Sequence, residues 1–123
     1  MEQILTLHVQ RRPGYVLVAA AGEIDISTVP RLRAVLDSAA AEGRRVIIDL
    51  HEITFIDASG LGALADAAGR AAAAGGSLHV TAVPSSVRRL LKITGLDRDL
   101  LTVPAEAEGA DGPGPALPSP EPS

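Results

Sequence analysis

A short polar stretch, Asp57-Ala58-Ser59-Gly60, lies between an apolar run and a segment rich in Ala and Leu. Loops that follow the strands of an α/β sheet are the usual reaction side of such a fold. A serine at a helix N-terminus meets free backbone N–H groups and a partial positive charge, which favour an anion such as phosphate. Ser59 is therefore a candidate for phosphorylation, and Asp57 is placed to orient the unmodified hydroxyl or to repel the phosphate.

The same residue types have a simpler interpretation, because Asp and Ser are common helix N-caps. Asp57 or Ser59 could do no more than cap the helix that follows. Asp25 could likewise cap a helix that begins near Thr28. Taken alone, the local pattern does not decide between a cap and a modification site.

Other kinds of site find little support in the sequence. The chain has no cysteine, which excludes disulfides, thiolate metal ligands and a Cys nucleophile. Ser59 does not fit a nucleophile elbow, since that pattern needs Gly where Asp57 stands. No GxxxxGK[ST] phosphate loop occurs. The three histidines lack metal-ligand spacing and are expected in strands (His8 and His79) and in a loop (His51). We therefore expect no catalytic residues, no metal ligands and no cofactor, and a protein that is not an enzyme.

Net charge and hydropathy limit the classes of binding partner and the cellular location that the sequence supports. The net charge of −4 favours neither nucleic acid nor an anionic membrane surface. No apolar run approaches the roughly 20 residues that span a bilayer, and the N-terminus lacks the features of a secretion signal. A cytoplasmic protein is expected. A basic helical face, formed by Arg88, Arg89 and Lys92, is expected to be solvated or, less simply, to meet an acidic partner.

Hydrophobic periodicity and turn residues predict strands that alternate with helices. The predicted strands are 4–10 and 15–22 (a hairpin around RRPG), 46–50, 77–83 and 100–103. The predicted helices begin at hydroxyl caps: one runs from Ser27-Thr28 to Gly43, one covers 59–74, and one runs from Ser85-Ser86 to Gly95. Residues 51–57 are predicted to form a loop.

This alternation predicts an α/β fold with a mixed, partly parallel sheet and crossover helices. At 123 residues the chain has room for one domain, which we place at residues 1–103. Residues 104–123 are rich in Pro, Gly, Ala, Ser and Glu and are predicted to be a disordered tail, because they offer too little apolar surface to offset the entropy of ordering.

Three stretches of this chain resemble the STAS domain family, in its single-domain bacterial form of anti-sigma factor antagonists. They are GEIDISTVPRLR at 22–33, VIIDLHEITFIDASGLGAL at 46–64 and LLKITGLDRDLLTV at 90–103. They come in the order and at the spacing of that family, and the resemblance covers about residues 4 to 103.

The resemblance implies a protein-binding switch. In that family the unphosphorylated antagonist binds an anti-sigma factor that is also a serine kinase, and so frees a sigma factor. The kinase uses ATP to phosphorylate the motif serine, which is Ser59 here, and a PP2C-type phosphatase restores it. Asp25 matches the family acid whose loop lies near that serine. The partner-binding residues implied are Asp25, Asp57, Ala58, Ser59, Gly60, Leu61 and Gly62.

This sequence departs from the family pattern at two places. The family often has two hydroxyl residues before the motif Gly, and the first of them is Ala58 here. Many members also continue into a further helix after the last strand, which PAEAEGADGPGP interrupts here. Two other functions stay open: a STAS scaffold or sensor module in which Ser59 is never modified, and a small enzyme or nucleotide-binding protein.

Overall fold

The structure is a computed structural model that describes residues 4–98 and 100–103. Its strands are β1 (Leu5–Arg12), β2 (Tyr15–Ile24), β3 (Arg45–Ile56), β4 (Ser77–Thr81) and β5 (Leu101–Val103). Its helices are α1 (Val29–Ala40), α2 (Ala58–Ala73) and α3 (Ser85–Thr94), followed by a short 3₁₀ turn, η1 (Leu96–Arg98). The predicted tail, 104–123, lies outside the described residues.

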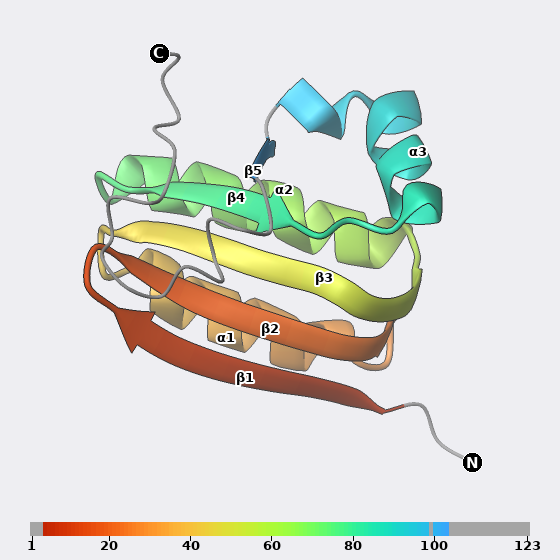
Figure 1. Cartoon of the computed structure of the whole chain (residues 1–123), viewed down its shortest axis with the longest axis horizontal. Coiled ribbons are helices and arrows are strands. Elements are labelled where there is room, and N and C mark those ends of the chain that lie inside the picture. The colour runs from red at the N-terminus through yellow and green to blue at the C-terminus, as the bar shows by residue number, and fades with distance from the viewer. Residues whose placement is uncertain (1–3, 99, 104–123) are drawn as a thin grey trace.

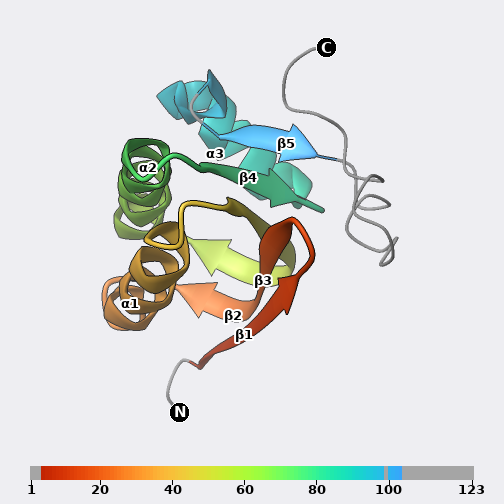
Figure 2. The same ribbon diagram turned by 90° about the vertical axis from the view of Figure 1, so that its left-hand side faces the viewer.

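The strands form one sheet in the order β1-β2-β3-β4-β5. β1 and β2 are an antiparallel hairpin, whereas the β2–β3, β3–β4 and β4–β5 pairs are parallel and joined by helical crossovers. Helices α1 and α2 lie side by side against one face of the sheet (Figure 1; Figure 2). The prediction of an α/β fold with a mixed, partly parallel sheet is confirmed.

The main core lies between that face of the sheet and the two helices. Alternate residues of the strands, such as Val18 and Ile48, pack there against Leu36 of α1 and Leu64 of α2, and all four are fully buried. A smaller cluster (Tyr15, Leu17, Ile47 and Val103) lies on the other face. Every residue from Val46 to Leu50 is buried, as expected for the apolar run of a central strand.

Strand β3 is longer than predicted, and residues 51–56 are strand where a loop was expected. The pairing of β2 with β3 shifts register twice, between Ala19 and Ala21 and between Gly22 and Glu23. Each shift places an extra residue on β3, so the ladder continues while the alternation of apolar and polar residues is lost. His51 therefore lies in a strand, and β2 likewise continues past Gly22 to Ile24.

Thr28 occupies the N-cap position of α1, as the predicted helix start requires, but the predicted hydroxyl caps of α1 and α3 do not form. The Thr28 hydroxyl accepts from the Asp25 N–H (3.0 Å) and donates to the Glu23 carbonyl (2.9 Å), so it braces the loop and does not cap α1. Ser85 and Ser86 lie inside the first turn of α3, whose N-cap position is Pro84, without a side-chain cap. Short polar side chains serve turns as readily as caps, and the sequence does not separate the two.

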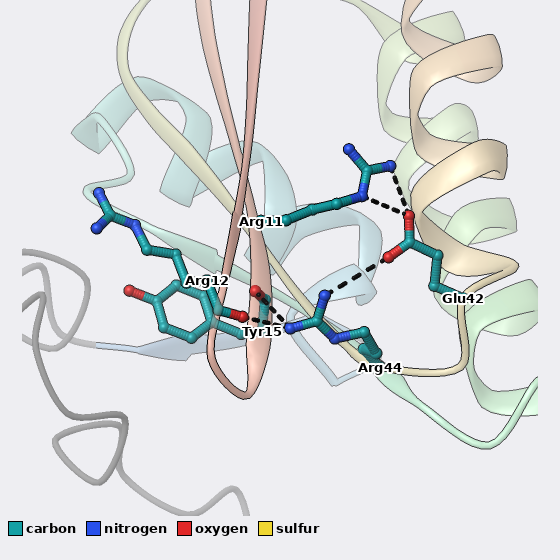
Figure 3. Close-up of polar contacts among 5 residues, drawn as sticks. All are labelled: Arg11, Arg12, Tyr15, Glu42 and Arg44. Carbon is teal, nitrogen blue, oxygen red and sulfur yellow. Dashed lines mark hydrogen bonds and ion pairs between the residues drawn. The ribbon is translucent and has the colours of Figure 1, made fainter.

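A polar network ties the hairpin to the connection between α1 and β3, at the sheet edge where β2 and β3 begin (Figure 3). Glu42 accepts from Arg11 Nε at 2.9 Å and lies 3.6 Å from Arg44 Nη1. Arg44 also donates to the backbone carbonyls of Arg12 and Tyr15. The loops that follow β2 and β3 lie at the opposite edge of the sheet, where these two strands end.

None of the helices in the described residues is long and apolar enough to cross a membrane.

Candidate functional site

The loops that contain Asp25 and Asp57 are held side by side by the parallel pairing of β2 and β3. The last paired residues of the two strands are Ile24 and Ile56, and each is followed directly by an aspartate. The backbone N–H of Asp57 donates to the carbonyl of Ile24 at 3.1 Å, which extends the contact by one residue. The two acids that are far apart in the sequence therefore lie at one edge of the sheet.

Asp57 is the N-cap of α2, as one of the two simple interpretations proposed. Its Oδ1 accepts from the backbone N–H groups of Ser59 (3.0 Å) and Gly60 (3.2 Å). The same oxygen accepts from the Ser59 hydroxyl at 2.6 Å. Three donors thus converge on one carboxylate oxygen, and the Ser59 side chain is held at the start of the helix, half-buried.

The Asp25 loop repeats this arrangement almost bond for bond. Asp25 Oδ1 accepts from the Ser27 N–H (2.9 Å), the Ser27 hydroxyl (2.7 Å) and the Thr28 N–H (3.1 Å). Ser27 is exposed, whereas Ser59 is half-buried. Ser27 was predicted only as part of a helix cap, although the repeated Asp-x-Ser spacing at 25–27 and 57–59 was the signal for a second arrangement of this kind.

Both aspartates are stabilised as carboxylates. The hydrogen bond from the Ser59 hydroxyl is the main cause that lowers the pKa of Asp57 below its ordinary value of 3.8, and the Ser27 hydroxyl does the same for Asp25. The negative charge of Asp25 acts in the opposite direction and raises the pKa of Asp57 slightly. The edge that carries Ser59 is therefore anionic at neutral pH before any modification.

Replacing Ser59 by Ala is expected to raise the pKa of Asp57, because its main stabilising hydrogen bond is lost. The pKa of Asp25 should stay low in this variant, and Ser27→Ala should produce the reverse pattern. A carboxyl-carbon NMR titration of both variants measures this. Since both folded-state pKa values lie below 3.8, each carboxylate stabilises the fold above that pH, and the contribution is lost as pH falls through the folded-state pKa. An unchanged Asp57 titration in Ser59→Ala would contradict this geometry.

The first turn of α2 is closely packed on one side and open on the other. A Cβ atom at Gly60 would lie 2.5 Å from Ile24 Cγ2 and 2.7 Å from Ile56 Cγ1, so no side chain fits there. At Gly62 the nearest atom, Arg33 Nη2, would be 3.9 Å away. Leu61 is buried in the core and Ala58 is exposed. The surface beside Ser59 thus consists mainly of backbone and small residues.

The histidines do not assemble a metal site. Among the described residues, no group of three or more His, Cys, Asp or Glu side chains is arranged to hold a metal ion. His51 Nδ1 contacts Asp49 Oδ1 at 2.9 Å, and His79 contacts the Ser77 hydroxyl at 2.8 Å. Burial lowers the pKa of His79 below its ordinary value of 6.5. These contacts belong to strands β3 and β4, not to the Ser59 edge.

Comparison with known proteins gives one consistent family. A family model described as "Mlab, STAS domain" matches residues 7–103. The anti-sigma-B factor antagonist of Bacillus subtilis is 31% identical over 85% of this chain and 95% of its own length. The protein of the same name from Staphylococcus aureus is 32% identical over 70% of this chain and 80% of its own length.

Solved structures agree with the sequence relatives. The crystal structure of an anti-sigma factor antagonist from Mycobacterium paratuberculosis matches with a TM-score of 0.73 and 29% identity, over 80% of this chain and 85% of that one. The structure of the anti-sigma factor antagonist SpoIIAA in its unphosphorylated form matches with a TM-score of 0.70 over 86% of this chain and 94% of that one, at 22% identity, which shows the fold alone. This chain belongs to the STAS domain family.

Proposed function

We propose that this chain is an anti-sigma factor antagonist and that phosphorylation of Ser59 switches it off. The observation that carries the proposal is the Ser59 hydroxyl, held 2.6 Å from Asp57 at the start of α2, in a family whose relatives here are named anti-sigma-B factor antagonists. In the unphosphorylated state the chain binds an anti-sigma factor that is also a serine kinase, and a sigma factor is released. A PP2C-type phosphatase removes the phosphate. The chain acts in the cytoplasm by binding and has no catalytic activity of its own.

The edge around Ser59 has the features of a protein-binding surface. An exposed apolar side chain lies near each of the two aspartates. Ile26 directly follows Asp25 and is 77% exposed, and Phe55 lies two residues before Asp57 and is 48% exposed. Large apolar side chains beside charged groups are common in protein interfaces. The proposed contact surface is the one implied by the family resemblance. Asp25, Asp57, Ala58, Ser59 and Gly62 lie at least partly exposed on it, and the buried Gly60 and Leu61 shape the helix start beneath it.

A phosphate on Ser59 would act mainly through charge and volume. It adds about −1.5 to −2 charge at neutral pH, next to a carboxylate that is already ionised. Gly62 carries no side chain on the open side of the first turn of α2, so a partner that packs closely against that turn has little room for the added group. Like charges brought together in an interface cost several kcal/mol, which is enough to separate two proteins of ordinary affinity.

Phosphate mapping tests the proposal. The chain is incubated with ATP and the cognate anti-sigma factor kinase, and phosphopeptides are identified by mass spectrometry. One phosphate is expected at Ser59, and it should be absent in Ser59→Ala. Ser27→Ala is the matched control, because Ser27 makes the same hydrogen bonds to Asp25 that Ser59 makes to Asp57. A wild-type chain that carries no phosphate at Ser59 would support an unmodified scaffold or sensor module instead.

A further inference from the structure

Arg33 of α1 reaches across to α2 and lies close to the first turn of that helix. The two helices run side by side on the sheet (Figure 2). Arg33 Nη1 donates to Asp66 Oδ2 at 2.8 Å, and both side chains are partly exposed, at 38% and 54%. An ion pair this exposed contributes little to stability and exchanges partners easily.

The guanidinium group of Arg33 also lies beside Gly62 of α2. A Cβ atom at Gly62 would have Arg33 Nη2 as its only neighbour within 4 Å, at 3.9 Å, so the group lies beside Gly62. Residues three and four apart share one face of a helix, which puts Ser59, Gly62 and Asp66 on the same face. With about 1.5 Å of rise per residue, Ser59 is about 4.5 Å from Gly62 along the axis and Asp66 about 6 Å away on the other side.

A phosphate on Ser59 would attract the Arg33 guanidinium more strongly than the Asp66 carboxylate does. It carries up to about two negative charges and three acceptor oxygens, and the planar guanidinium pairs with phosphate through two parallel hydrogen bonds. Asp57 and Asp25 both repel a phosphate on Ser59, so a cation close to Ser59 has a large stabilising effect on the phosphate charge. Asp66 also keeps a second cation, because Arg70 contributes to lowering its pKa.

We propose that Arg33 is the intramolecular receptor of the Ser59 phosphate: on phosphorylation it leaves Asp66 and pairs with the phosphoserine. This inference rests on the proposed function, since it assigns what the modified Ser59 binds. The exchange draws the end of the Arg33 side chain over the first turn of α2 and frees the Asp66 carboxylate. Phosphorylation then alters the surface of α1 and α2 as well as the charge at Ser59. An aspartate at position 59 would be too short to reproduce this contact.

The test uses the full chain with phosphoserine installed at position 59 during translation, so that no kinase is needed. Phosphorus NMR gives the second pKa of the phosphate. Arg33→Gln is expected to raise that pKa by at least about 0.5 unit, because an opposite charge at this range stabilises the dianion. Arg11→Gln is the matched control: it removes an equal charge from an exposed ion pair, with Glu42 at 2.9 Å from Arg11 Nε, at the opposite end of the sheet, and should leave the phosphate pKa unchanged.

A second readout covers the case in which the substitution alters the fold. In the otherwise unaltered chain, the Arg33 Nε resonance should shift when Ser59 carries phosphate, and the Asp66 carboxyl resonance should shift with it. Equal phosphate pKa values with and without Arg33, or an Arg33 resonance that does not respond, would overturn the inference. Neither result depends on whether a kinase modifies Ser59, so failure here is distinguishable from failure of the proposed function, which the phosphate mapping decides.

Discussion

Ser59→Asp is expected to weaken binding to the anti-sigma factor by about 100-fold, or about 2.7 kcal/mol. The substitution adds one negative charge beside Asp57, whose carboxylate accepts a hydrogen bond from the Ser59 hydroxyl at 2.6 Å. The new carboxylate repels that of Asp57 and any acidic group that the partner brings, and like-charge contacts of this kind are costly in an interface. Ser59→Ala removes the hydroxyl without adding charge and should bind within a few fold of the wild type.

Isothermal titration calorimetry with the purified anti-sigma factor measures this difference. Ser38→Asp is the matched control, because Ser38 is an exposed residue of α1 that lies towards the other end of the sheet. It adds the same charge and should bind like the wild type. Equal affinities for Ser59→Ala and Ser59→Asp would remove the charge-based switch from this account.

Gly60→Ala is expected to lower the free energy of unfolding by about 1–3 kcal/mol, the usual cost of overpacking a core. The added Cβ would lie 2.5 Å from Ile24 Cγ2 and 2.7 Å from Ile56 Cγ1, closer than atoms can approach without movement. Ile24 and Ile56 are the buried residues that end β2 and β3 just before the two aspartates. The substitution should therefore also shift the Asp25 and Asp57 loops relative to each other.

Urea denaturation measures the loss, with two controls in the same helix. A Cβ atom at Gly69 meets nothing within 4 Å, so Gly69→Ala should stabilise the protein by about 0.5–1 kcal/mol through helix propensity. Gly62→Ala meets only Arg33, at ordinary contact distance, and should not destabilise it. A Gly60→Ala variant as stable as Gly62→Ala would show that the packing of the first turn of α2 is looser than described.

The sequence predicted those parts of the fold that depend on regular patterns. The apolar run at Val46–Leu50 indicated a central strand, and helical spacing of Leu61, Leu64 and Ala68 located α2 to within one residue. Alternation of strands and helices was enough for the parallel crossovers. The proximity of Asp25 to Asp57 came from the family resemblance, and the pairing of Ile24 with Ile56 supplies its physical cause.

The sequence did not predict features that arise from irregular pairing or from contacts between distant segments. Bulges let β3 continue through residues 51–56 after its alternation was lost, and thereby turned a predicted loop into strand. Thr28 is a residue type common at helix N-caps, but its hydroxyl donates a hydrogen bond within its own loop. The approach of Arg33 to Gly62 depends on how α1 packs beside α2, which no local pattern encodes.

Displacement of a sigma factor tests the Ser59 switch most directly. A fluorescently labelled sigma factor is bound to its anti-sigma factor, and the chain is added with Ser59 either unmodified or as phosphoserine, while anisotropy is recorded. We predict that the unmodified chain releases the sigma factor in a saturable way and that the phosphoserine-59 chain does not at the same concentrations. Release by both forms alike, or by neither, would contradict a Ser59-switched anti-sigma factor antagonist.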